Sequence, residues 1–114
     1  MPIDISDVND KLRRITLTGR LDVPGTEEIV IKFAEAATAG GRRVVVDMTA
    51  VSFLGSIGIR ALLSNAEALQ SKGGRMVLFV GSNVMVAKTL QAIGIDALIP
   101  TFADAAVAEK TALN

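Results

Sequence analysis

The feature that most constrains the fold is a junction that occurs twice, in which a helical segment ends at two glycines and arginine leads into a strand-like run. The glycine pairs are Gly40–Gly41, before the run 44–46, and Gly73–Gly74, before the run 76–80. Glycine readily adopts the left-handed conformation that ends a helix. Helices that alternate with strands in this way are typical of parallel strand pairing, so the centre of the chain is predicted to be α/β.

The remaining segments extend this pattern at both ends of the chain. Apolar and polar residues alternate on both sides of Asn9–Asp10, which predicts an antiparallel hairpin over residues 3–17. The run 44–46 is apolar and β-branched, as in a strand that is covered on both faces. The spacing of apolar residues predicts helices from Asp22 to about Gly40, from Ile57 to about Ser71, from a cap at Ser82 or Asn83 to Gly94, and from Phe102 to about Thr111, with a short strand from Ala97 to Pro100.

These elements predict one α/β domain over residues 1–114, with a mixed sheet of about five strands, an N-terminal antiparallel hairpin and about four helices. The chain has 114 residues, of which 50% are hydrophobic and 21% are charged, which suits a single dense core. It has a formal net charge of zero and no basic block, which argues against nucleic acid as the main partner.

Several chemistries are excluded because the residues that they need are missing. The chain contains neither Cys nor His, which removes disulfides, thiolate chemistry, the commonest metal ligand and the commonest general base. No phosphate-binding GxxxxGK[ST] loop is present, and no acid, base and nucleophile can be assembled into a catalytic set. We therefore expect no catalytic residues, no cofactor and no enzymatic activity.

Metal binding and membrane insertion are also not expected. Asp4, Asp7 and Asp10 recur at every third residue, but within an alternating strand and its turn they are typical of a solvated sheet edge. The amino terminus lacks the regions of a signal peptide, and no apolar run approaches the ~18 residues of a membrane span. A soluble cytoplasmic protein is the expectation.

Ser56 is the residue on which a functional hypothesis can be built. It lies where the apolar strand turns into the second predicted helix, and a helix N-terminus favours negative charge, so a phosphate would be tolerated there. Ser is also a preferred N-cap residue, and the two roles are compatible. Gly55 and Gly58 permit the close approach of another protein.

Two aspartates lie near the ends of predicted strands. Asp22 follows the second strand and could share an edge of the sheet with Ser56, although it could equally cap the first helix. Asp47 is predicted to end the central strand and to orient the loop that follows.

Three segments of the chain, Gly19–Asp22, Val45–Met48 and Val51–Ile59, together resemble the STAS domain of bacterial anti-sigma-factor antagonists. The similarity covers nearly the whole chain, including the order of elements and the closing helix. In that family, a serine at the start of the second helix is phosphorylated by a partner that is both a Ser kinase and an anti-sigma factor. The unphosphorylated antagonist binds this partner and frees its sigma factor, and a PP2C-type phosphatase resets the antagonist.

The resemblance implies that Ser56 is the phosphoacceptor and that Asp22 is the aspartate of the family's Gly-x-Leu-Asp segment. The partner-binding surface expected around them comprises Arg20, Asp22, Phe53, Leu54, Gly55, Ser56, Ile57, Gly58 and Arg60.

A second hypothesis keeps the fold but changes the role of Ser56. The family often has Asp before the phosphorylated Ser and a hydroxyl residue after it, whereas this chain has Gly55 and Ile57. That departure favours a constitutive STAS interaction subunit of a transporter or lipid-transport complex, in which Ser56 is only a helix cap.

Overall fold

A computed structural model describes residues 2–114 and contains a five-stranded sheet with helices on both faces. The elements in chain order are β1 Ile3–Asp7, β2 Leu12–Leu21, α1 Val23–Thr38, η1 Ala39–Gly41, β3 Arg43–Leu54, α2 Ser56–Ser71, β4 Arg75–Phe79, α3 Val84–Ile93, η2 Ile95–Ala97, β5 Thr101–Phe102 and α4 Ala105–Leu113. Both predicted Gly-Gly junctions occur, and Gly73 has the left-handed φ of +84° that ends α2.

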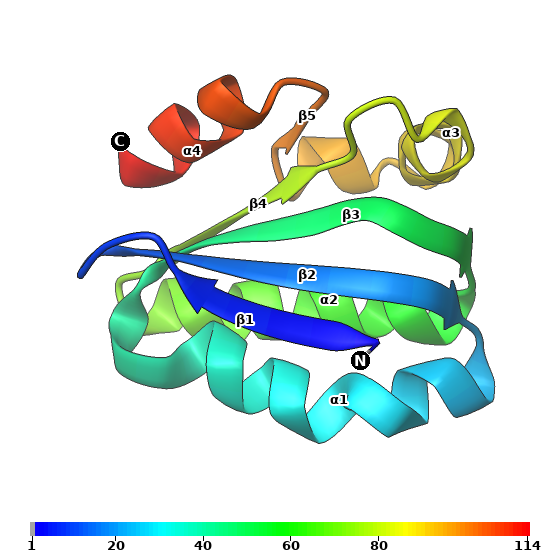
Figure 1. Cartoon of the computed structure of the whole chain (residues 1–114), viewed down its shortest axis with the longest axis horizontal. Helices are drawn as coiled ribbons and strands as arrows, with labels where there is room; N and C mark the ends of the chain where they lie inside the picture. The colour runs from blue at the N-terminus through cyan, green and yellow to red at the C-terminus, as the bar shows by residue number, and fades with distance from the viewer. Residues whose placement is uncertain (1) are drawn as a thin grey trace.

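The strands lie in the order β1-β2-β3-β4-β5, with β1 antiparallel to β2 and every other pair parallel. Helices α1 and α2 cover one face of the sheet, and α3 and α4 lie on the other (Figure 1). The predicted mixed five-stranded α/β sheet with its N-terminal hairpin and four helices is therefore confirmed. The edge position of β1, which carries Asp4 and Asp7, fits the predicted solvated edge.

The main core lies between the sheet and the pair α1 and α2. Its most completely buried large side chains include Phe33 of α1, Leu62 and Leu69 of α2, and Ile15 and Leu17 of β2. A smaller cluster under α4 is built from Leu12, Val45, Val77, Ala108 and Ala112. The layers thus follow from the apolar periodicity of the helices and the alternation along β2.

The central strand is longer than the sequence predicts. Asp47 does not end it, because β3 runs on to Leu54. The Asp47 carboxylate accepts hydrogen bonds from the backbone N–H of Thr49 at 2.9 Å and from its hydroxyl at 2.7 Å, and Arg14 lies 3.2 Å away. These partners satisfy the buried charge inside the strand, so the strand does not need to stop there.

The last part of the chain also differs from its prediction. Residues 97–100 do not form a strand, because a 3₁₀ turn occupies Ile95–Ala97 and the fifth strand is Thr101–Phe102, paired with Leu78 and Phe79. The final helix begins at Ala105 instead of Phe102, since Asp104 is its N-cap and accepts a hydrogen bond from the N–H of Val107 at 3.0 Å.

Asn83 fastens α3 to the central strand. Its side-chain oxygen caps the helix by accepting from the N–H of Val86 at 3.3 Å, which selects Asn83 over Ser82 as the cap. Its amide donates to the carbonyls of Val51 at 2.8 Å, Met48 at 3.0 Å and Thr49 at 3.3 Å. One side chain therefore both starts α3 and holds the carboxyl-terminal half of β3.

Candidate functional site

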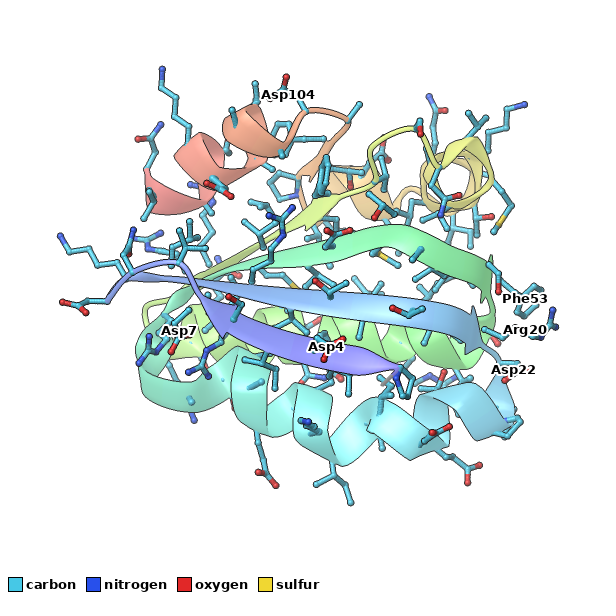
Figure 2. The ribbon with its side chains drawn as sticks, in the orientation of Figure 1. Asp4, Asp7, Arg20, Asp22, Phe53 and Asp104 are labelled. Carbon is cyan, nitrogen blue, oxygen red and sulfur yellow. The ribbon has the colours of Figure 1, made fainter. Side chains whose placement is uncertain are left out.

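Two strand-to-helix turns meet at the carboxyl-terminal end of the sheet. β2 ends at Leu21 immediately before α1, and β3 ends at Leu54 immediately before α2. The two strands are parallel, so both turns lie at the carboxyl ends of the strands. The N–H of Gly55 donates to the carbonyl of Leu21 at 3.0 Å and so joins the two turns. Figure 2 shows Arg20, Asp22 and Phe53 together at this end of the sheet.

Ser56 is the first residue of α2, and it is not the N-cap. The cap position belongs to Gly55, which has an extended backbone with φ −92° and ψ 175° and supplies no side-chain capping bond. Ser56 is exposed, and within residues 2–114 its hydroxyl has no hydrogen-bond partner. The expectation that Ser56 caps the helix is therefore wrong, because the chain turns one residue earlier. The hydroxyl is left accessible at the positive end of a helix.

Arg20, Asp22 and Phe53 form a connected group beside this turn. The Arg20 guanidinium lies 4.6 Å from the centre of the Phe53 ring, and its Nε donates to Asp22 at 3.0 Å. The other Asp22 oxygen accepts from the N–H of Gly25 at 2.9 Å and so caps α1. This bond to Gly25, and then the bond to Arg20, lower the pKa of the Asp22 carboxyl below its ordinary value. Phe53 remains 38% exposed, so its ring is available to a partner.

Close packing leaves room only for glycine behind this group. A side chain at Gly58 would place its Cβ 2.9 Å from the Cβ of Leu21 and 3.1 Å from Cδ1 of Leu54. A Cβ on Gly25 would collide with the Arg20 carbonyl. Leu54 and Gly58 are themselves buried, so in the free domain they shape the site from beneath and do not face a partner.

A mainly apolar groove of about 210 Å³ runs between α1 and α2 near the start of α2. Ile57 and Arg60, two of the predicted surface residues, line it from α2. Thr26, Glu27 and Val30 line it from α1, and sequence reasoning did not single them out. Glu27 and Val30 lie three residues apart and so share one face of α1, which is the signal that could have indicated this wall.

The described part of the chain presents an accessible hydroxyl and a partly exposed surface around it. No group of three or more metal-binding side chains occurs within residues 2–114. None of the helices that the structure describes is long and apolar enough to cross a membrane. Seven of the nine predicted surface residues are at least partly accessible at the carboxyl-terminal end of the sheet: Arg20, Asp22, Phe53, Gly55, Ser56, Ile57 and Arg60.

Comparison with known proteins identifies the class of domain. The sequence model of the STAS domain matches residues 5–108, so the chain belongs to the STAS domain family. Among curated proteins, none matches the sequence significantly.

Solved structures share the fold. An anti-sigma factor antagonist from Mycobacterium paratuberculosis superposes with a TM-score of 0.82 at 20% identity, covering 98% of this chain and 93% of its own. The unphosphorylated anti-sigma factor antagonist SpoIIAA gives 0.74 at 23%, covering 96% and 95%. The phosphorylated form of SpoIIAA, a cell fate determinant of Bacillus, gives 0.68 at 23%, covering 96% and 98%.

Proposed function

We propose that this STAS domain is an anti-sigma-factor antagonist that is controlled by phosphorylation of Ser56. In its unphosphorylated state it binds a Ser-kinase anti-sigma factor and releases the sigma factor. Phosphorylation by that kinase ends the interaction, and a PP2C-type phosphatase restores it. The observation that carries the proposal is the exposed Ser56 hydroxyl, without a partner in residues 2–114, at the first position of a 16-residue helix.

The surroundings of Ser56 support a role in binding a protein partner. The Phe53 ring and the Arg20 guanidinium provide an exposed aromatic and cationic contact, which is a combination enriched at protein interfaces. The groove beside Ile57 and Arg60 extends the same surface toward α1. The similarity in fold to anti-sigma factor antagonists, one of them solved with and without phosphate, points to the class of partner.

The expected switch acts mainly on the interface. A phosphate at Ser56 adds about −1.5 to −2 charges, while the helix N-terminus stabilises it by only about 0.3–1 kcal/mol, so the fold itself should change little. The same charge placed against a partner surface fitted to a neutral hydroxyl costs several kcal/mol, and every ~1.4 kcal/mol changes affinity tenfold.

One observation favours a second candidate function. Gly55 and Ile57 provide neither charge nor a hydroxyl beside Ser56, as would suit a constitutive interaction subunit of a transporter or lipid-transport complex. In that case Ser56 is simply an exposed residue of the first turn, since Gly55 holds the cap position.

A kinase reaction separates the two candidates. The purified domain, incubated with ATP and a cognate anti-sigma Ser kinase, should gain one phosphate, and Ser56→Ala should gain none. Ser52→Ala is the matched control, because Ser52 is exposed four residues upstream. It should be phosphorylated like the parent chain. Equal phosphorylation of Ser56→Ala, or none of the parent chain in a reaction where the kinase modifies itself, would contradict the switch.

A further inference from the structure

The amino-terminal end of the parallel strands, opposite the Ser56 site, carries a cluster of positively charged side chains that the proposed function does not use. Five of the chain's twelve cationic side chains, Lys11, Arg42, Arg43, Lys72 and Arg75, gather where β3 and β4 begin. Arg42 lies 3.5 Å from Asp7, and Lys72 donates to the carbonyl of Thr38 at 3.4 Å. Arg43 and Arg75 have neither an ion pair nor a side-chain hydrogen bond with residues 2–114.

Arg43 and Arg75 are neighbours across the sheet. They are register partners on the parallel strands β3 and β4, whose backbones lie about 4.8 Å apart. Like charges placed opposite one another destabilise a sheet, and no carboxylate in the described chain forms an ion pair with either arginine. Each strand begins within two residues of a glycine pair, and each carries an arginine as its first residue. An anion bound between the two guanidinium groups would remove the repulsion.

A cleft of about 400 Å³ opens at these two arginines. Gln70 of α2 adds a polar group to its wall, and Leu98, Ile99 and Pro100 form the side that leads into β5. Leu98 is 69% exposed, so its side chain is accessible to a ligand in the cleft. The cleft therefore joins a dicationic end to an apolar wall.

We propose that this cleft binds a small organic phosphate monoester, with the phosphate between Arg43 and Arg75 and the organic part against Leu98 and Pro100. A phosphate monoester fits better than a carboxylate because it carries nearly two charges and enough acceptor oxygens for two guanidinium forks. The proposed site is separate from Ser56, because the 16 residues of α2 extend for about 24 Å from the carboxyl-terminal end of the sheet to the amino-terminal end.

Titration with phenyl phosphate, followed by ¹⁵N–¹H NMR, tests the proposal. The amides of residues 74–76 and 97–99 should shift and saturate, and those around Ser56 should not. The double variant Arg43→Gln/Arg75→Gln should weaken binding at least tenfold. The control Lys32→Gln/Lys88→Gln removes the same charge from exposed helix positions and should bind like the parent chain.

Two further ligands separate the parts of the site. Inorganic phosphate should bind at the same amides more weakly than phenyl phosphate, and benzyl alcohol, which has no charge, should not saturate. Linear shifts with phenyl phosphate, equal loss of binding in both double variants, or equal binding of benzyl alcohol would overturn the proposal. Should the double variant fail to fold, Arg75→Gln alone should weaken binding at least threefold, and unchanged binding would again overturn it.

Discussion

The substitution Asn83→Asp tests how α3 is held against the central strand. The new carboxyl has the shape of the amide and can still cap the helix, since Asp and Asn are equally good caps. It loses the donor that reaches the carbonyls of Val51 at 2.8 Å and Met48 at 3.0 Å. Each lost hydrogen bond is worth about 0.5–1.5 kcal/mol, and a carboxylate facing carbonyl oxygens adds to the penalty. We expect a destabilisation of about 2–4 kcal/mol at pH 7.

Thermal unfolding measures this difference. At about 4 °C per kcal/mol for a domain of this size, Tm should fall by about 8–16 °C. The matched control is Asp104→Asn at the cap of α4, where within residues 2–114 the side chain bonds only to the N–H of Val107, and it should leave Tm nearly unchanged. Protonation of the new carboxyl would restore a donor toward these carbonyls, so the penalty should shrink once the pH is low enough to protonate it. A Tm equal to that of the parent chain at pH 7 would refute this account of the contact.

Substitutions at three further positions test the site. Gly58→Val should lower the free energy of unfolding by about 1–3 kcal/mol through the clash with Leu21, and Gly58→Ala by less; equal stability of all three proteins in urea would contradict the packing. The ionised Asp22 stabilises the fold above its unfolded pKa of about 3.9, and this contribution is lost as the pH falls through its lower folded pKa, so Asp22→Asn should flatten the pH dependence of Tm below pH ~4; an unchanged profile would contradict it. Phe53→Leu should leave Tm within a few degrees but weaken binding to the anti-sigma kinase about tenfold, and calorimetry showing full affinity would remove Phe53 from the interface.

Most elements of the fold could be predicted from periodicity and from the glycines that end helices. The exceptions arise where a local signal depends on contacts made elsewhere. Asp47 looks like the end of a strand, but Thr49 and Arg14 satisfy its carboxylate and β3 continues. The fifth strand is only two residues long and exists because Thr101 and Phe102 pair with β4, which no sequence pattern displays.

The position of the site could be predicted, but its internal geometry could not. The change from strand to helix indicates where Ser56 lies, yet a one-residue difference in the helix start transfers the cap position to Gly55. The stacking of Arg20 on Phe53 depends on the register between β2 and β3, which pairs these two residues after two register shifts. Those shifts follow from tertiary packing, and the order of residues does not show them.

Phosphopeptide mass spectrometry on the protein isolated from its native cells tests the central claim most directly. Trypsin releases Val44–Arg60 as one peptide, which contains three hydroxyl residues, Thr49, Ser52 and Ser56. The account predicts one phosphate, which fragment ions place on Ser56 and which disappears after treatment with a PP2C-type phosphatase. A phosphate on Thr49 or Ser52, or an unmodified peptide under every growth condition in which the partner kinase is present, would contradict it.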